Sequence, residues 1–420
     1  MTIPATTLRF MTRFRCIAER CEDTCCGGLR VGVSEASVQR IHETLRAAGA
    51  PEPIEEFSIP FPEGAPSERV LLRMRPDGHC VFFSAERNCS LHRDHGEAVL
   101  PDVCSTFPRT LWKQDGRLEV SGSLACPEAV RLLLLAEDAV EPVPVTPGLV
   151  TRPEAARPAP GLPGDPYVLH AGAVRDALRE FLLPRGHPLS SRLSALARWA
   201  FRMDALFRGP NPLPEGEEEI GALLRAELQS GGAAMAVAQV PREPLEPWEE
   251  GGPRVLRLLT QLKDLSGVTR SERFARFVQG SRMALGVTGE EAQDGSGAWR
   301  LYTVRRAGLE AHHGPRLEQY FHHYLENYLL RHPHTEAFGL QAYVYRLSVR
   351  LARVRLTLVA HPEVSSGCAR ETLDQAAVEC FQVLSRNVDL APDFLALPRE
   401  GLTGDRALCL QETLAWARFS

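Results

Sequence analysis

Apolar positions recur at three- and four-residue intervals through most of the second half of the chain. The clearest run contains Leu317, Tyr320, Phe321, Tyr324, Leu325, Tyr328 and Leu329. This spacing places the side chains on one face of an α-helix. Comparable patterns cover residues 173–207, 255–265, 271–285, 342–359 and 372–385. They predict an irregular, mostly α-helical domain without a repeat of fixed length.

The first part of the chain shows shorter apolar runs separated by turn signals. Residues 69–75 and 81–83 flank Pro76-Asp77-Gly78, and residues 110–124 contain a second turn at Asp115-Gly116. Both arrangements predict β-hairpins. The sequence Cys126-Pro127-Glu128 then predicts a helix start, with proline and an acidic residue in the first turn. Cys126 should therefore lie at a helix N-terminus, where free amides and the helix dipole favour a thiolate.

A proline-rich segment separates the two patterns. Residues 140–166 contain eight prolines in 27 positions, a density that disfavours regular structure. The segment is either a free linker or a strap across the surface. We therefore predict an α+β protein with three parts. Residues 1–139 form a small cysteine-rich, metal-binding domain of short hairpins and helices, residues 140–166 a linker, and residues 167–420 an all-α domain.

Composition narrows the class of protein. The chain has 420 residues, 44% of them apolar, and a formal net charge of −5. It has no long basic run, which argues against a nucleic-acid partner. Its longest apolar stretch, residues 130–136, is far shorter than the roughly 18 residues of a membrane span, and the N-terminus lacks the apolar core of a signal peptide. These features predict a soluble cytoplasmic protein.

Eight of the eleven cysteines fall within the first 126 residues, at positions Cys16, Cys21, Cys25, Cys26, Cys80, Cys89, Cys104 and Cys126. In a reducing compartment, clustered cysteines are more often metal ligands than disulfides. Eight thiols match two four-thiolate sites, or one iron–sulfur cluster and a second metal. The later residues Cys368, Cys380 and Cys409 are widely spaced, and we expect them to be buried apolar side chains.

The cysteine spacing excludes some common sites. The run C-x4-C-x3-CC is not a zinc ribbon, which needs two C-x2-C pairs. The C-x3-C-x2-C spacing of radical enzymes is also missing, because position 28 is Gly. In an extended backbone, Cys25 and Cys26 would face opposite sides, so we expect them to serve different sites or different irons of one cluster.

The sequence lacks the usual phosphate- and nucleotide-binding loops and the common hydrolase motifs. Arg109 ends the sequence CSTFPR, five residues after Cys104. A guanidinium there could neutralise an anionic cluster or bind a carboxylate through two parallel hydrogen bonds. The other interpretation is a structural arginine on a turn.

Three strings carry a resemblance to a known family: RFRCIAERCEDTCCGG, GHCVFF…NCSLHRDHGEAVLPDVCSTFPR and SGSLACPEAVRLLL. They resemble the flagellin lysine N-methylases, within a wider cysteine-cluster group described as zinc- or iron-chelating. The motif match covers about residues 10–135 and is specific. The helical half shows only a general likeness, around residues 317–330 and 346–361.

The resemblance implies a protein-lysine N-methyltransferase that uses S-adenosylmethionine and carries an iron–sulfur cluster, of the 4Fe-4S type. It implies that ligands come from the eight N-terminal cysteines, without telling which four, and that the substrate is a protein with exposed lysines such as flagellin. We expect Arg109 to bind the carboxylate of the methyl donor.

The chemistry does not itself require a metal. A neutral lysine amine can attack a sulfonium methyl group once it has lost a proton, from a group whose pKa is about 10.4. The metal could anchor the donor, stabilise the domain or drive radical chemistry, and the missing radical spacing favours the first two. The alternative function is a zinc- or iron-binding protein, or a metal-dependent redox enzyme, without methyl transfer.

Overall fold

The computed structural model describes residues 5–28, 31–50, 53–114, 116–146, 148–208, 232–240, 248–269, 271–288, 295–337, 339–390 and 405–420, with positions 222 and 226. These residues form two compact units. Unit 1 comprises residues 1–132 and 141–157, and unit 2 comprises residues 133–140 and 158–420. The predicted α+β class is confirmed, with strands in unit 1 and a largely helical C-terminal region.

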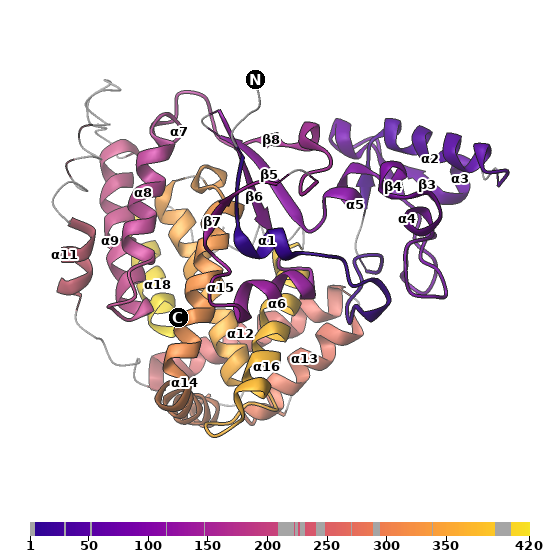
Figure 1. The fold of residues 1–420 in the computed structure, drawn as a ribbon. Helices are drawn as coiled ribbons and strands as arrows, with labels where there is room; N and C mark the ends of the chain where they lie inside the picture. The colour runs from indigo at the N-terminus through magenta and orange to yellow at the C-terminus, as the bar shows by residue number, and fades with distance from the viewer. Residues whose placement is uncertain are drawn as a thin grey trace. The chain divides into compact units, whose positions relative to one another are not determined.

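Unit 1 contains a five-stranded sheet in the order β7-β1-β6-β5-β8 (Figure 1). The strands are β1 Ala5–Leu8, β5 Arg109–Gln114, β6 Arg117–Gly122, β7 Pro142–Pro144 and β8 Arg157–Pro158. Strands β5 and β6 form the predicted hairpin around Gly116, while Asp115 lies outside the described residues. Strand β1 runs parallel to β6, and the Thr7 hydroxyl donates to the Val120 carbonyl at 2.8 Å.

A second sheet in unit 1 has three short strands in the order β2-β4-β3. These are β2 Gly32–Val33, β3 Ser58–Pro60 and β4 Val70–Leu72. Helix α2 (Glu35–Ala47) begins at Ser34, whose hydroxyl accepts from the Ser37 amide. Its apolar face lies in the core with Phe57 and Leu91. The short helices are α1 Arg9–Arg13, α3 Ile54–Phe57, α4 Ser90–His95 and α5 Asp102–Thr106.

The first predicted hairpin is only partly correct. The chain turns at residues 75–79, where the Arg75 amide donates to the His79 carbonyl. Residues 81–83 do not form a strand, and the returning chain makes only an isolated bridge between Met74 and Cys80. Strand β4 instead pairs with β2 and β3, and Leu72 of β4 lies in the same core as Val33 of β2.

The proline-rich segment contains short ordered pieces. Three of its eight prolines, Pro142, Pro144 and Pro158, lie in strands β7 and β8, and residues 153–155 form a 3-10 turn. Strand β7 pairs antiparallel with β1 at an edge of the sheet, where a missing amide hydrogen is tolerated. Residues 141–157 are thus part of unit 1. The three-part division of residues 1–139, 140–166 and 167–420 stays a prediction.

Unit 2 is built from helices, coloured from magenta to yellow in Figure 1. They are α7 Pro166–Leu169, α8 Ala171–Leu182, α9 Leu189–Arg208, α11 Gly232–Gln239, α12 Trp248–Thr269, α13 Glu272–Ala284, α14 Ser296–Arg331, α15 Leu340–Val359, α16 Arg370–Leu384 and α18 Arg406–Phe419. The apolar pattern over residues 173–207 corresponds to two helices, α8 and α9, because Pro184, Gly186 and Pro188 interrupt the helical structure between them. Helix α6 (Pro127–Leu135), predicted from its first turn, contains the boundary between the units.

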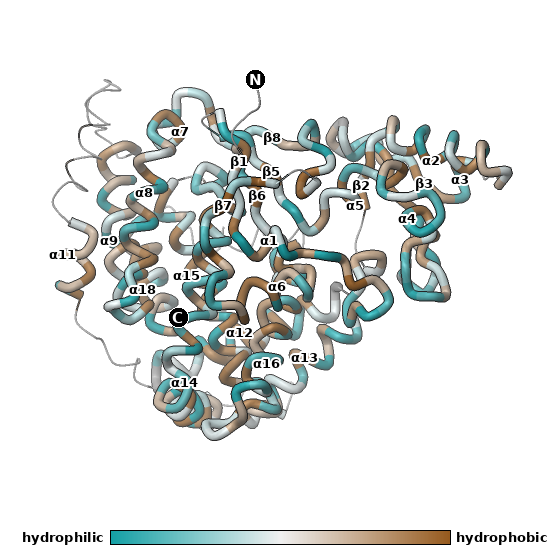
Figure 2. Tube along the Cα trace, in the orientation of Figure 1, coloured by the Kyte–Doolittle hydropathy of each residue, from teal (hydrophilic) through white to brown (hydrophobic). Residues whose placement is uncertain are grey.

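Helix α15 is central to unit 2 and packs against α9 and α18. Of its residues, only Tyr345 and Arg346 are not buried. The tube in Figure 2 alternates brown and teal along these helices, as expected when apolar faces pack inward. The tyrosines of α14 are likewise part of the core, since Tyr320, Tyr324 and Tyr328 are all buried.

Within the described residues, no helix has both the length and the apolar character that a membrane crossing requires.

Candidate functional site

The first cysteine segment follows α1 and consists of tight turns. Residues 18–20 form a 3-10 turn that ends at Cys21, whose amide donates to the Ala18 carbonyl at 2.9 Å. Ala18 has a positive φ of 44°, a conformation that non-glycine residues seldom adopt. Cys25 and Cys26 occupy a turn, and Gly27 then pairs with His79. The chain reversals bring Cys21 close to Cys16, and Cys26 close to Cys25.

The turn at residues 25–28 pairs with the hairpin that carries Cys80 and Cys89. The Cys80 amide donates to the Cys26 carbonyl at 2.7 Å, and the Gly28 amide donates to the Gly78 carbonyl at 2.9 Å. Cys89 bridges back to Phe83 and immediately precedes α4. Segments more than fifty residues apart thus place Cys26, Cys80 and Cys89 against one hydrophobic core.

These three thiols and Cys104 form one group, which we call the four-thiol group. Hydrogen bonds link the thiols of Cys25, Cys26 and Cys89, and the bond with Cys25 is the main cause that raises the pKa of Cys26 to about 12. Burial raises the pKa of Cys80, with a further contribution from Cys89.

Cys104 joins the group from α5. Burial and then the charges of Cys80, Cys26 and Cys89 raise the pKa of Cys104. The residue as a whole is exposed, while its sulfur lies near the thiols of Cys80, Cys26 and Cys89. Helix α5 is held in place by Arg152, which contacts the Asp102 carboxylate at 3.0 Å and the Ser105 hydroxyl at 2.9 Å.

Cys16, Cys21 and Cys126 form a second group, which we call the three-thiol group. Burial raises the pKa of Cys126 to about 12, and the charges of Cys21 and Cys16 add to the rise. Burial also raises the pKa of Cys21, where Cys16 again contributes. An ion pair between Glu22 and Arg131 of α6, at 2.6 Å, ties the loop beside Cys21 to the helix that follows Cys126.

Backbone amides point at several of these sulfur atoms. The Asp23 amide interacts with Cys21, the Phe82 amide with Cys80, and the amides of Leu91 and His92 with Cys89. Each donor lies two or three residues after its cysteine, and each lowers the pKa of that thiol. Amide hydrogen bonds to sulfur stabilise thiolate charge and tune metal–thiolate centres.

Cys126 lies where the sequence predicted, between β6 and the first turn of α6. The amides of Ala129 and Glu128 favour its thiolate, as expected for a helix N-terminus. The sequence led us to expect a favoured thiolate at Cys126. Burial of the thiol outweighs the two amides, however, and its pKa is raised.

The prediction that Cys25 and Cys26 face opposite sides rested on an extended backbone, and that premise is wrong. Both residues lie in a turn, and their thiols form a hydrogen bond with each other. That they serve different sites, or different irons of one cluster, stays a prediction.

Arg109 is the first residue of β5. Its guanidinium carbon lies 5.4 Å from the ring centre of Phe14, two residues before Cys16. The preceding residue, Pro108, accepts a hydrogen bond from the Ser123 amide at 2.6 Å, three residues before Cys126. Burial lowers the pKa of Arg109, and its Nε atom has no hydrogen-bond partner among the described residues. A half-buried guanidinium with unused donors suits an anionic ligand.

The cysteine thiols are suitable ligands for a soft metal or an iron–sulfur cluster, because thiolates bind both. Backbone amides also point at several of the sulfur atoms. Across the described part of the chain, no group of three or more His, Cys, Asp or Glu side chains is arranged so that it could hold a metal ion, and metal binding is therefore a prediction from the chemistry of the thiols. All eight N-terminal cysteines are free thiols.

The later cysteines behave mostly as predicted. Cys380 and Cys409 are buried apolar residues. Cys368 is the exception, since it is half-buried and its sulfur lies 4.0 Å from Nε2 of His313.

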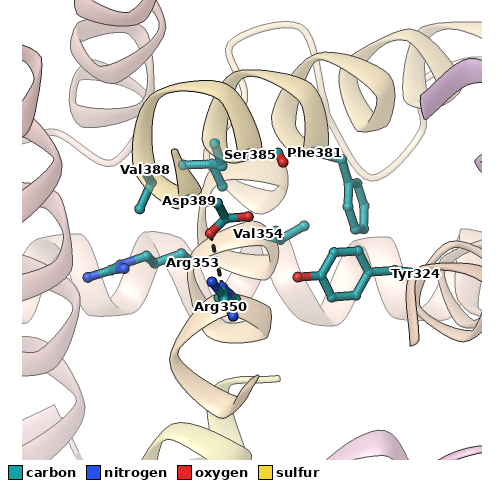
Figure 3. Close-up of a pocket in the computed structure, with 9 residues that line it drawn as sticks. Tyr324, Arg350, Arg353, Val354, Phe381, Ser385, Val388 and Asp389 are labelled. Carbon is teal, nitrogen blue, oxygen red and sulfur yellow. Dashed lines mark hydrogen bonds and ion pairs between the residues drawn. The ribbon is translucent and has the colours of Figure 1, made fainter. Parts of the chain in front are cut away.

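Unit 2 contains a small cavity that was not predicted from the sequence. Its lining residues are Tyr324, Arg350, Arg353, Val354, Phe381, Leu384, Ser385, Val388 and Asp389 (Figure 3). A signal existed in the sequence, because Arg346, Arg350, Arg353 and Arg355 interrupt an otherwise apolar helix at close spacing.

Comparison with known proteins gives three similar sequences. The lysine-N-methylase of Salmonella typhimurium (strain LT2) is 26% identical over 142 residues, which cover 33% of this chain and 34% of that protein. The lysine-N-methylase of Salmonella choleraesuis is 25% identical over 138 residues, with 33% and 34% covered. One third of this chain is similar to lysine-N-methylases.

A third relative, flagellar biosynthetic protein FliU of Salmonella muenchen, is 27% identical over 143 residues, covering 33% of this chain and 81% of that protein. The alignment spans about a third of the length of the two lysine-N-methylases. No protein-family model matches the chain, and no solved structure matches it. The resemblance found in the sequence motifs is therefore confirmed, at low identity.

Proposed function

We propose that this protein is an S-adenosylmethionine-dependent protein-lysine N-methyltransferase. The observation that carries the proposal is the similarity to lysine-N-methylases together with the thiol groups of unit 1. The flagellar name of the third relative supports flagellin as the protein substrate.

We further propose that Cys26, Cys80, Cys89 and Cys104 hold an iron–sulfur cluster, because such clusters take about four thiolates. Cys16, Cys21 and Cys126 would hold a second metal, which when bound would supply a Lewis acid for the amino-acid end of the methyl donor. Cys25, hydrogen-bonded to Cys26, is a further thiolate ligand available to either site.

Arg109 would bind the donor carboxylate. Its position beside Phe14 and near the chain that leads to Cys126 supports this role. In the reaction, the neutral lysine amine attacks the sulfonium methyl group. The new C–N bond forms as the C–S bond breaks, S-adenosylhomocysteine leaves, and one proton passes to solvent. The chain's contribution to that step is alignment of the two reactants.

The experiment is anaerobic purification, followed by iron and sulfide analysis, a visible spectrum and incubation with S-adenosylmethionine and flagellin. We expect iron and sulfide, broad absorption near about 400 nm as is usual for such clusters, and a flagellin mass gain corresponding to methyl groups on lysine. Zinc without iron or sulfide, and no methylated flagellin, would favour the alternative of a metal-binding protein without transfer activity.

The donor site has its own test in Arg109→Ala, with Arg117→Ala as the control. Arg117 lies on the partner strand of the same hairpin and is exposed. Calorimetry should show that Arg109→Ala weakens S-adenosylhomocysteine binding about ten- to a hundredfold, as expected for a lost charge-assisted contact. Metal content should remain unchanged in both variants. Equal affinities for the two variants would reduce Arg109 to a structural residue.

A further inference from the structure

Cys368 differs from the other two cysteines of unit 2. Cys380 and Cys409 are buried, and burial raises the pKa of both thiols, that of Cys409 to about 11. Cys368 is half-buried instead, in the loop between α15 and α16, so a small molecule can reach its sulfur from solvent.

A base lies beside this thiol. The Sγ atom of Cys368 is 4.0 Å from Nε2 of His313, a half-buried residue of α14. This distance is at the long end for a hydrogen bond between sulfur and nitrogen, but contacts between a nucleophile and its base are often loose before a reactant binds. A thiol with a neighbouring imidazole is a common arrangement for a nucleophilic cysteine.

The loop that carries Cys368 is held against α14. The Arg305 guanidinium of α14 donates to three carbonyls at the end of α15 and in the loop, at 2.6–2.8 Å, those of Val359, His361 and Val364. Gly308 lies so close to the loop that an added Cβ atom would be 2.6 Å from the side chain of Ser366. The contact between Cys368 and His313 thus belongs to an ordered packing of two segments.

Open space adjoins both members of the pair. Gly367 precedes Cys368, and Gly314 follows His313. Apart from its immediate neighbours in the chain, a Cβ atom built on either glycine would meet no described atom within 4 Å. Pro315 comes next inside α14. Glycine and proline both disfavour a helix interior, so helix stability does not explain this sequence beside His313.

A metal site is the other possible use of a cysteine and a histidine in contact. A structural zinc site takes four ligands, and among the described residues no group of three or more suitable side chains could hold an ion. The pair is therefore better suited to nucleophilic chemistry.

We propose that Cys368 is a nucleophilic thiol that undergoes reversible exchange with a small disulfide, and that His313 is its base. The Cys368 thiol passes its proton to Nε2 of His313, and the thiolate attacks one sulfur of the disulfide. A new S–S bond to Cys368 forms as the S–S bond of the reactant breaks, and the departing thiolate takes the proton from the imidazolium. The product is a mixed disulfide, which a second thiol reverses. This modification does not depend on the proposed methyl transfer.

The test uses the disulfide of 2-mercaptoethanol, a small uncharged probe, on the full chain at neutral pH. After remaining thiols are blocked with N-ethylmaleimide, peptide mass spectrometry gives the rate at each cysteine separately. Cys368 should react about tenfold or more faster in the folded chain than in the chain unfolded in urea, where no base is held beside it. Cys380 should react only in the unfolded chain, because it is buried. A Cys368 rate in the folded chain that is equal to or below the unfolded rate would overturn the proposal.

His313→Gln removes the base and keeps a polar side chain, so it should slow the reaction of Cys368 about tenfold or more. His312→Gln is the matched control, because the ring of His312 is exposed and its Nδ1 contacts the Gly308 carbonyl instead, at 2.8 Å. The control should react as the unmodified chain does. Equal Cys368 rates in the two variants contradict the role of His313. The comparison of folded and unfolded chains needs no substitution, so it remains decisive if His313→Gln does not fold.

Discussion

At the scale of single residues, the surroundings of each cysteine separate possible ligands from packing residues. Cys89 precedes α4 and has two amides directed at its sulfur and another thiol hydrogen-bonded to it. Cys380, in contrast, lies fully buried in α16 among apolar side chains. The same side chain is a candidate ligand in one place and a small apolar residue in the other.

This contrast predicts the metal content of two matched variants. Cys89→Ser should lose most of the bound iron, since serine does not replace a thiolate ligand in the four-thiol group. Cys380→Ser should keep all of it and lose about 1–2 kcal/mol of stability, because a hydroxyl replaces a buried thiol. Iron and sulfide analysis of anaerobically purified protein measures the difference. Equal iron loss in the two variants would refute the segregation of ligands in unit 1.

Asp204 is a second residue whose role is set by its contacts. Its carboxylate accepts from the Tyr167 hydroxyl at 2.5 Å and from the amides of Leu340 and Gln341 at 3.1 and 2.9 Å. It therefore caps the N-terminus of α15 although it belongs to α9. Those two amides have no acceptor within the helix itself.

Asp204→Ala should destabilise the protein by about 2–4 kcal/mol, because it removes a charged cap and leaves three donors buried. Urea unfolding at pH 7, followed by tryptophan fluorescence, measures the change. Asp176→Ala, at an exposed position on α8, serves as a control that should stay near the unmodified value. A loss below about 0.5 kcal/mol for Asp204→Ala, within the range of surface substitutions, would show that water replaces the carboxylate.

At the scale of elements, close packing of α12 against α14 depends on one glycine. A Cβ atom built on Gly251 would lie 2.5–2.7 Å from ring atoms of Trp299, which is itself buried. Gly267, on the same helix, is exposed and has open space around it. Both positions are helical, so alanine changes the helix propensity in the same way at each. The difference between the two stability changes therefore measures the packing against Trp299.

Gly251→Ala should therefore destabilise unit 2 by about 1–3 kcal/mol, the usual cost of overpacking. Gly267→Ala should stabilise it by about 0.5–1 kcal/mol, because alanine favours the helix over the unfolded chain. The midpoints of urea unfolding for the two variants, compared with the unmodified chain, test whether the first is destabilised and the second stabilised. Stabilisation by both substitutions would mean that Trp299 moves aside without cost.

At the scale of the whole molecule, the two units differ in what stabilises them. Unit 1 has small sheets and a core that includes Cys80, with Cys26 and Cys89 packed against it. Unit 2 has a large helical core in which titratable groups are buried. Burial lowers the pKa of His334 to about 4 and raises the pKa of Glu336 to about 7.

These shifts predict how stability depends on pH. The unfolded chain binds a proton on His334 as the pH falls below about 6.5, whereas the folded chain binds it only near pH 4. Stability from His334 is thus present above pH 6.5 and lost towards pH 4, by about 3 kcal/mol at most. Glu336 acts in the opposite direction, since its stabilisation is present below its ordinary pKa and is lost as the pH rises towards 7.

The measurement is the free energy of unfolding in urea at several pH values from 4.5 to 7.5, for the unmodified chain, His334→Gln and Glu336→Gln. His334→Gln should lose less stability on acidification than the unmodified chain, and Glu336→Gln should lose more. If the free energy of unfolding changed with pH in the same way for all three proteins, neither group would be buried as described.

The sequence by itself determined the local elements and the location of the thiols. Helical periodicity marked most helices of unit 2, the turn at Gly116 marked the β5–β6 hairpin, and Cys126-Pro127-Glu128 marked the start of α6. These signals need only residues a few positions apart, so they can be read along the chain. The density of cysteines before residue 127 required no structure at all.

Tertiary structure decided which side chains meet. The grouping of Cys126 with Cys16 and Cys21 joins residues about a hundred positions apart, and no spacing rule encodes that contact. The pairing of β4 with β2 and β3 overrode a plausible local hairpin, because buried neighbours outweigh a favourable turn. The buried arginines of α15 were invisible for the same reason: a charged residue looks solvent-exposed in a sequence, and only partners such as Asp389 and Tyr328, brought from other helices, allow it to stay inside.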